Sequence, residues 1–408
     1  MGDLAKPSDR HGVDRRGFLA GGAAALAVLL GACGTDLPIA DGGGDRDGED
    51  ASGRSVVIVG AGAAGMTAAH LLRQRGATVR VLEAASSAGG RVRHDRDFVD
   101  FPLPLGAEWV HVDESILDEI VNDPDVEVST ELVPYAEDDE LASIDEDYNV
   151  TMLPLRDFFD GDTKFVGSSW LDFFETCILP GIADAVSYDT QVVEVQHDDS
   201  GVSVIDAVRV AHRADHVIVT VPLAVLQRRD IVFSPPLESD RLEAIDEAEI
   251  WSGFKAFFEF AEAFYPAATA FPDSDTDEGQ RLFYDAAYGQ DTEHHVLGIF
   301  CAGAPAERYQ AMTDEVFLAD VLAELDQATD GAASQHYRRH RVQDWNAEPF
   351  ARGAYLADHA PSWISERLAE PLGSNVYFAG DAYTSFDDWG SVHTAVRSAA
   401  SAVDALFG

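Results

Sequence analysis

Lysine is almost missing from this chain of 408 residues, where it occurs only as Lys6, Lys164 and Lys255. Arginine therefore carries nearly all of the positive charge. The 73 acidic residues outnumber the 28 basic ones, which gives a formal net charge of −45. A negative field of this size argues against nucleic acid and anionic membrane surfaces as partners.

The same composition is typical of proteins from extreme halophiles, in which an acidic surface stays hydrated in concentrated salt. An acidic protein from an ordinary environment is the alternative. The charge does not by itself indicate a cationic substrate, because at molar salt the Debye length is about 3 Å and long-range steering is largely screened.

Cysteine is also scarce, occurring as Cys33, Cys177 and Cys301. Their spacing matches no C-x-x-C or zinc pattern. We expect Cys177 and Cys301 to be buried free thiols, with a disulfide between them as the alternative. His336 and His340 lie four residues apart, but the polar residues around them form no apolar helical face, so no metal site is predicted.

The apolar segment near the N-terminus is too short to span a bilayer. Phe18–Ala32 has 15 residues, whereas a transmembrane helix needs about 20. It follows Arg15 and Arg16 in a stretch that resembles a twin-arginine export signal, and Leu30–Cys33 resembles a lipobox. An uncleaved anchor or a chance pair of arginines is the alternative.

We therefore expect residues 1–33 to be a signal that ends in a lipidated Cys33. Residues 34–54 are rich in glycine and acidic residues, so they cannot bury a core and are expected to form a linker. The folded part would be exported and held at the cell surface through the lipid on Cys33, its only membrane contact.

The strongest motif begins at an apolar strand expected over residues 56–59. The strand runs into G-x-G-x-x-G at Gly60, Gly62 and Gly65, and a helix is expected from about residue 63 to 74. Glycines in this turn let the backbone approach a diphosphate, and the helix directs its first N–H groups at the phosphates. Glu83 ends the next strand, where its carboxylate can accept the ribose hydroxyls.

A second glycine turn indicates which dinucleotide the domain binds. Gly89, Gly90 and Arg91 follow the acid closely. This arrangement is similar to that of large FAD proteins, and simple nicotinamide dehydrogenases do not usually carry it. FAD is therefore favoured over NAD.

Further strands of the same domain appear much later in the chain. Strands are expected near residues 190–196, 201–205, 214–222 and 375–381, and a helix with one apolar face over 392–407. We therefore predict an α/β fold with a discontinuous Rossmann-type FAD-binding domain and a smaller mixed α+β substrate domain. The expected boundaries are 55–112, 186–240 and 346–408 for the first domain, and 113–185 and 241–345 for the second.

These residues together resemble the flavin-dependent amine oxidase family, which includes monoamine and polyamine oxidases. The resemblance runs from about residue 56 to 403. The segments that carry it are Gly60–Arg91, Leu105–His111, Val219–Leu223, Pro349–Tyr355, Phe378–Asp381 and Gly390–His393.

The resemblance implies roles for residues beyond the glycine motif. Residues 105–111 would pass over the flavin ring, Val193 would contact adenine through its backbone, and Trp345 would lie beside the flavin. With the motif residues, the expected FAD-binding set is Gly60, Gly62, Ala63, Ala64, Gly65, Glu83, Gly89, Gly90, Arg91, Gly106, Ala107, Glu108, Trp109, Val193, Trp345, Gly380, Asp381, Ser391 and Val392.

Two residues are expected to act in the chemistry, namely Lys255 and Tyr355. Lys255 lies in an aromatic strand whose alternation puts Lys255, Phe257 and Glu259 on one face. In the family, a lysine at this place holds a water against flavin N5, and a compact ammonium suits that task better than arginine. The alternative is a solvent-facing lysine paired with Glu259. The resemblance makes Tyr355 an aromatic wall of the substrate cage.

Several positions depart from the family pattern. Ala354 stands where monoamine oxidases link a cysteine to flavin, so FAD is expected to be non-covalent. Asp381 replaces a glutamate, and Ser391 stands where a second cage aromatic is expected. Trp389 or Phe386 is the candidate replacement for that aromatic wall.

The resemblance implies oxidation of a small-molecule amine by hydride transfer to flavin N5. The imine would be hydrolysed by water, and oxygen or another acceptor would reoxidise the flavin. An FAD oxidoreductase acting on C–C bonds, similar to carotenoid desaturases or protoporphyrinogen oxidase, is the nearer alternative. A flavin-binding surface lipoprotein without turnover is the alternative of another class.

Overall fold

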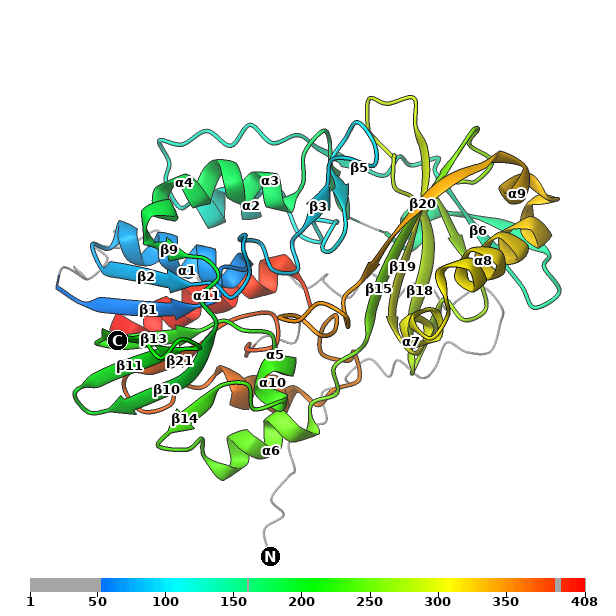
Figure 1. Ribbon diagram of the computed structural model, residues 1–408. Coiled ribbons are helices and arrows are strands. Elements are labelled where there is room, and N and C mark those ends of the chain that lie inside the picture. The colour runs from blue at the N-terminus through cyan, green and yellow to red at the C-terminus, as the bar shows by residue number, and fades with distance from the viewer. Residues whose placement is uncertain (1–52, 160, 386–389, 408) are drawn as a thin grey trace, which may run out of the picture.

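The computed structural model describes residues 53–159, 161–385 and 390–407. The expected signal, Cys33 and nearly all of the linker lie outside the described residues, as do Phe386 and Trp389. The described chain forms two parts, which stand left and right in Figure 1.

A parallel five-stranded sheet forms the centre of the first part. Its strands come from three distant stretches of sequence and lie in the order β21-β13-β1-β2-β9. Strands buried on both faces read as continuous apolar runs, as residues 56–59 and 217–219 do. The strands are β1 (Ser55–Val59), β2 (Thr78–Leu82), β9 (Val186–Ser187), β13 (His216–Val219) and β21 (Val376–Phe378).

The two faces of this sheet bury separate cores, because side chains alternate along a strand. Val56 and Ile58 join the core formed with α1 (Ala63–Gln74) and α11 (Val392–Phe407). Figure 1 shows red α11 running beside blue α1. Both helices have the predicted ranges.

Val57 and Val59 face the opposite core. That core is covered by a sheet of order β12-β11-β10-β14 and by three helices. These elements are β10 (Val192–Asp198), β11 (Gly201–Asp206), β12 (Ala211–Ala214), β14 (Val232–Ser234), α5 (Leu223–Gln227), α6 (Ser239–Glu247) and α10 (Ser362–Ala369).

The second part is built on a larger mixed sheet of order β20-β15-β19-β18-β16-β6-β7, with β17 paired to β18. Its strands are β6 (Glu140–Ile144), β7 (Val150–Pro154), β15 (Gly253–Phe260), β16 (Ala268–Ala270), β17 (Asp275–Thr276), β18 (Gly279–Asp285), β19 (His295–Gly303) and β20 (Tyr337–Asp344). Helices α7 (Ala304–Gln310), α8 (Asp314–Thr329) and α9 (Ala332–His336) accompany it.

The alternation predicted for the aromatic strand is confirmed in β15. Phe254, Phe258 and Phe260 lie in the core that includes α8, whereas Phe257 lies in a different cluster together with Trp109. The strand is fully buried because it is paired with β19 and β20 along its edges and packs into a core on each face.

The expected domain boundaries need a correction. Helix α2 (Ser115–Val121) and the helical residues 170–185 bury their apolar faces in the core of α1 and α11, so they belong to the first part. Of residues 113–185, only β6 and β7 join the large sheet. Helix α6, expected in the second part, also packs into the first. An amphipathic pattern shows that a helix has a face to bury, but not which core receives it.

The helical stretch over residues 170–185 is broken into short turns. It comprises α3 (Trp170–Phe173), a π-helical turn (Phe174–Ile178), α4 (Leu179–Ile182) and a 3₁₀ turn (Ala183–Ala185). Pro180 has no N–H to continue the ladder, which accounts for the restart at α4. The remaining short strands are β3 (His94–Asp95), β4 (Leu103–Pro104), β5 (Leu132–Pro134) and β8 (Thr163–Phe165), and a 3₁₀ turn covers Leu155–Asp157.

Cys177 and Cys301 are free thiols, and only Cys301 is fully buried. Within the described ranges, no helix has both the length and the apolar character needed to cross a bilayer.

Candidate active site

A cavity of about 930 Å³ lies between the two parts and draws its walls from both. The first part contributes Gly60, Glu83 and Asp381, and the second contributes Lys255 and Gln280. The volume is at the upper end of the range usual for small-molecule and cofactor sites.

The glycine turn lies at the edge of the parallel sheet and forms one wall. Gly60, Gly62, Ala63 and Ala64 line the cavity. Gly65 lies behind them, where a Cβ would come within 2.0 Å of the Gly60 carbonyl oxygen, so only glycine fits. Helix α1 starts without a side-chain cap, which leaves its first N–H groups free to meet a diphosphate.

Glu83 follows β2 and lines the same wall. Its Oε2 accepts a hydrogen bond of 2.6 Å from the Ala61 N–H, and its Oε1 accepts one of 2.8 Å from the Ala85 N–H. Burial raises the pKa of this carboxyl, against the lowering effect of those N–H groups. Each oxygen keeps lone pairs that can receive ribose hydroxyls.

Gly89, Gly90 and Arg91 continue the wall, and Arg91 ties three segments together. Its guanidinium forms a two-pronged ion pair with Asp381, one contact being 2.9 Å to Oδ2, and also donates to the Ala354 carbonyl. Gly380 and Asp381 line the cavity just after β21. The shorter aspartate therefore keeps its place by pairing with arginine.

Val193, the position expected to meet adenine, stays a prediction, because its neighbour lines the cavity instead. Val193 does not line the cavity, whereas its neighbour Val192 does. The pairing of β10 with β11 is irregular between Val192 and Glu194, which is typical of a β-bulge. A bulge changes which side of the strand a residue faces, and its place could not be inferred from alternation.

Residues 105–109 cross the cavity between the two parts. Gly106, Ala107, Glu108 and Trp109 all line it. A Cβ at Gly106 would lie 1.8 Å from the Arg91 carbonyl oxygen and 2.9 Å from the Trp345 ring, so the crossing requires glycine there. Trp345 also lines the cavity, and its Nε1 donates to the Leu105 carbonyl over 2.9 Å.

Lys255 projects from β15 to the same crossing. Its Nζ donates to the carbonyls of Pro104 and Gly106, each at 3.1 Å, and to Glu108 Oε2 at 2.7 Å. Burial lowers the pKa of the Lys255 ammonium below its ordinary value, although Glu108 opposes that shift.

The alternative pairing of Lys255 with Glu259 is wrong. Glu259 accepts from Arg339 Nε at 2.5 Å and contacts His294 Nδ1 at 2.8 Å. Glu259 lies four residues along the strand from Lys255, and its partners come from a different part of the fold.

Tyr355 also lines the cavity and is held in place by a polar contact. Its hydroxyl donates to Gln280 Oε1 over 3.1 Å, and Gln280 Nε2 donates to Asp358 Oδ2 over 2.7 Å. Burial raises the pKa of Tyr355 well above its usual value, and Asp358 adds to that shift. The phenol is therefore neutral at any physiological pH.

The start of α11 completes the lining. Ser391 and Val392 face the cavity. Ser391 Oγ accepts from the Thr394 N–H over 3.2 Å and contacts its hydroxyl at 2.7 Å, which accounts for serine and threonine at this helix start.

Four further residues of the site were not among the expected ones. His111 lines the cavity and contacts the buried Asp162 at 2.9 Å. Gln280 and Asp358 adjoin Tyr355, and Lys164 contacts Glu108 from outside the cavity. Within the described ranges, no group of three or more His, Cys, Asp or Glu is placed to hold a metal ion.

The residues present fit FAD. The uncapped α1 and the glycine turn suit a diphosphate, Glu83 suits a ribose, and the crossing at Gly106 leaves no room for a side chain. The cavity then continues past the dinucleotide cradle to Lys255, Trp345 and Tyr355. That continuation is what a flavin with a substrate beside it requires.

Comparison with known families decides the assignment. The model described as flavin containing amine oxidoreductase matches residues 181–407, more than half of the chain. The chain belongs to this family. A second model, an NAD(P)-binding Rossmann-like domain, matches residues 58–122. This protein is therefore an FAD-dependent amine oxidoreductase, and its flavin is held without a covalent bond, Ala354 offering no thiol.

Similar proteins include Polyamine oxidase 4 of Oryza sativa subsp. japonica, which is 24% identical over 87% of this chain and 88% of its own length. Lysine-specific histone demethylase 1B of Mus musculus is 23% identical over 81% of this chain and 50% of its own.

Solved structures share the fold. Putrescine oxidase bound to putrescine has a TM-score of 0.70 at 19% identity, covering 87% of this chain and 99% of that one. Cyclohexylamine oxidase from Brevibacterium oxydans has a TM-score of 0.71 at 18% identity, covering 86% and 98%.

Acid precipitation of this amine oxidoreductase is expected to leave the yellow flavin in the supernatant, because residue 354 carries no nucleophile. The matched variant is Ala354→Cys, which puts a thiol in the cavity wall, and partial retention of flavin in its pellet would show that residue 354 faces the cofactor. Flavin retained in the pellet of the unaltered protein would contradict the expectation.

Proposed function

We propose that this protein is an oxidase of aliphatic amines that carry a second cationic group. The observation that carries the proposal is the meeting of Lys255 with Trp345 and Tyr355, from two distant stretches of the chain, at the end of the dinucleotide cradle. When bound there, FAD supplies the two-electron oxidation that turns an amine into an imine, which water hydrolyses, and passes the electrons on to oxygen or another acceptor.

The protein's own groups orient the amine and control protons. Tyr355 presents an uncharged ring, held in place by its hydrogen bond to Gln280. Lys255 Nζ has three protons and three acceptors, so it can exchange one carbonyl contact for a water or a reacting group without losing Glu108. Its lowered pKa makes release of a proton from Nζ easier than for an exposed lysine.

The acidic surroundings of Tyr355 support the second cation. Asp358 lines the cavity beside Gln280. Asp275 lies close enough that Asp358 adds to the effect of burial in raising its pKa to about 6. Above that pH the Asp275 carboxylate is charged, and its negative charge attracts an ammonium. The names of similar proteins, polyamine oxidase and putrescine oxidase, agree with such a substrate.

Anaerobic mixing with a panel of amines tests this activity through loss of the flavin absorbance. Diamines are expected to reduce the flavin at lower concentrations than monoamines of equal chain length. The variant Asp358→Asn should remove most of that difference while leaving monoamines nearly unaffected. If no amine reduces the flavin, the proposal is wrong. Reduction by an alkene or porphyrinogen substrate would favour oxidation of C–C bonds instead.

Replacing Lys255 by methionine keeps the approximate length of the side chain and removes its charge and donors. FAD should still bind, whereas flavin turnover should fall by roughly 10²- to 10⁴-fold, as is typical when a positioned proton-transfer group is lost. Stopped-flow measurement of flavin reduction and of reoxidation separates the two half-reactions.

The matched control is Glu259→Gln, which alters another buried charged residue of the same strand face. It should lower thermal stability but leave both half-reactions near their original rates. Unchanged half-reactions in Lys255→Met would mean that Lys255 only stabilises the crossing segment.

We also propose that the protein is exported and anchored by lipid on Cys33. The support is the sequence alone: Arg15 and Arg16 before a short apolar segment, and Leu30–Cys33 after it. The acidic, lysine-poor composition likewise supports a high-salt environment.

Changing Cys33 to serine is expected to release the protein from membranes, since no acceptor for the lipid remains. Replacing Arg15 and Arg16 with lysine should block export, because the pathway reads the pair. Cell fractionation with an antibody measures both. A Cys33→Ser protein that still sediments with membranes would disprove the lipid anchor.

A further inference from the structure

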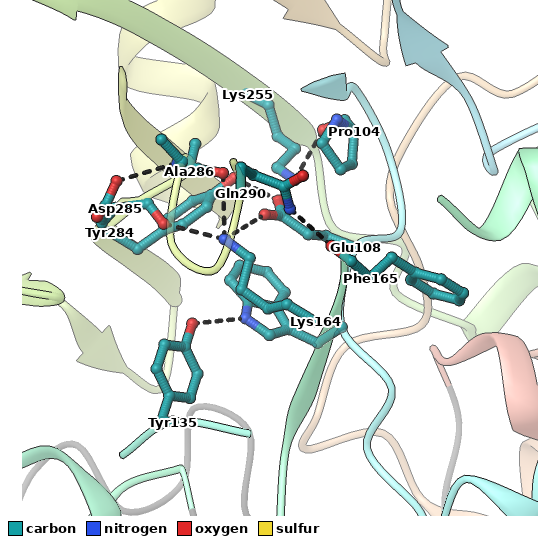
Figure 2. A network of polar contacts seen from close by, with 12 residues as sticks. Pro104, Glu108, Tyr135, Lys164, Phe165, Lys255, Tyr284, Asp285, Ala286 and Gln290 are labelled. Atoms are coloured by element: carbon teal, nitrogen blue, oxygen red, sulfur yellow. Dashed lines mark hydrogen bonds and ion pairs between the residues drawn. The ribbon is translucent and has the colours of Figure 1, made fainter. Parts of the chain in front are cut away.

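Two of the three lysines in this chain meet at one buried carboxylate. Glu108 is 4% exposed, Lys255 is 3% exposed and Lys164 is 2% exposed. Figure 2 shows both ammonium groups pointing at Glu108, Lys255 from one side and Lys164 from the other. In a chain that has arginine at nearly every other cationic position, this convergence needs a physical reason.

The contacts of Glu108 divide between its two oxygens. Oε2 accepts from Lys255 Nζ at 2.7 Å and from the Tyr284 hydroxyl at 2.6 Å. Lys164 Nζ lies 3.1 Å from Oε1, but at an angle that does not make a hydrogen bond. The carboxylate is therefore held on one side by two hydrogen bonds and on the other by charge alone.

Lys164 is fixed independently of Glu108. Its Nζ donates to the Asp285 carbonyl at 2.9 Å and to the Ala286 carbonyl at 3.3 Å. Its ammonium also lies over the Tyr284 ring, 5.4 Å from the ring centroid, and Lys255 lies 5.5 Å from the same centroid. Tyr284 thus lies against both cations, and an aromatic ring is attractive to each.

The charges of the cluster do not balance. With both lysines protonated, two positive charges face one negative charge, and four backbone carbonyls supply the remaining stabilisation. Lys255 and Glu108 line the cavity, whereas Lys164 does not. Lys164 therefore touches no space that a flavin or an amine can enter, and it can affect the reaction only through the groups that it faces, Glu108 and Lys255.

We propose that Lys164 is a positioning residue for the oxidation: it fixes Glu108 from behind and sets the place and the protonation of the Lys255 ammonium at the cavity. The expected effect of Lys164 on amine oxidation rests on the proposed function, whereas its expected effect on the Lys255 ammonium does not. An ammonium suits the position because its compact charge fits between two carbonyls and a carboxylate, where a planar guanidinium is too broad.

The direction of the pKa shifts agrees with this arrangement. Burial opposes the charged form of Glu108, yet Lys255 and Lys164 outweigh it and hold the pKa of Glu108 below its usual value. Burial lowers the pKa of Lys255, Glu108 acts against that shift, and Lys164 adds to it. The other ionisable groups around the cluster are Tyr284, Tyr135, Asp162, Asp285 and Cys301.

Removing the charge of Lys164 and removing the charge of Glu108 should therefore move the Lys255 pKa in opposite directions. Lys164→Met removes a positive charge that disfavours protonation, so the Lys255 pKa should rise. Glu108→Gln removes the negative charge that favours protonation, so the pKa should fall. Lys164→Arg keeps the charge and should leave the pKa near its original value while disturbing the place of Glu108.

The scarcity of lysine makes the measurement direct. The FAD-loaded protein labelled with ¹³C at lysine Cε should give three lysine signals at most, and Lys164→Met and Lys255→Met assign two of them. Titration of the Lys255 signal in each variant gives its pKa without any amine turnover. Flavin reduction by the best amine is measured in parallel, and Lys164→Met should slow it by up to about 100-fold, as a small misplacement of a catalytic group can.

Arg281→Met is the matched control. Arg281 is 1% exposed and lies on β18, the strand of Tyr284, but pairs with Asp273 and Glu324 away from Glu108. It should lower the melting temperature and leave the Lys255 pKa unchanged. If Lys164→Met does not fold, Lys164→Gln serves as the neutral variant.

A Lys255 pKa that stays the same in the neutral Lys164 variant, or that shifts equally in Arg281→Met, would overturn the proposal. If the pKa moves as expected but no amine reduces the flavin of the unaltered protein, the positioning of Lys255 stands and the proposed function fails.

Discussion

The fold depends on a charge that is shared between its two parts. Glu108 belongs to the segment that crosses the cavity, and its partners Lys164, Lys255 and Tyr284 come from β8, β15 and β18. Removing one partner of a buried ion pair typically costs about 3–5 kcal/mol, because the remaining charge is left uncompensated. The two parts therefore cannot separate at this point without exposing a charge to solvent or leaving a buried charge without its partner.

A second ionic contact holds the crossing from the nucleotide side. Arg91 joins Asp381 and the Ala354 carbonyl, and its own backbone oxygen lies so close to Gly106 that no side chain fits there. The cradle and the catalytic end of the cavity are thus built on one short stretch of backbone. A substitution at Gly106 would disturb both ends together, which explains why the crossing segment, rather than either sheet, sets the geometry of the site.

Local sequence patterns predicted the first domain closely. The motif around Gly60 predicted the range of α1, and the spacing of apolar residues over 392–407 predicted that of α11. Both signals are local, since turn conformation and helical periodicity depend on residues close together in the sequence. The assignment of α2 and α6 failed, since each helix shows an apolar face without showing its partner. Val192 rather than Val193 lines the cavity where a bulge changes the facing of the strand, and alternation carries no sign of a bulge.

The candidate site was predictable where a residue type that is rare in this chain lies in an unusual local sequence. Lys255 was found because lysine is scarce and lies in an aromatic strand. Lys164 is equally rare but was not predicted, because its neighbours, Thr163 and Phe165, give no periodic signal and its meeting with Glu108 depends on tertiary packing. Gln280 and Asp358 come from segments 78 residues apart, so only the fold brings them beside Tyr355.

The burial of both described lysines has a consequence for the product of the reaction. An amine oxidised and hydrolysed yields a carbonyl compound, and aldehydes condense with exposed primary amines. Over the described residues, both lysine amines are shielded, and the exposed arginines carry guanidinium groups that stay protonated and are poor nucleophiles. The described surface therefore offers no lysine amine to an aldehyde that is formed beside it.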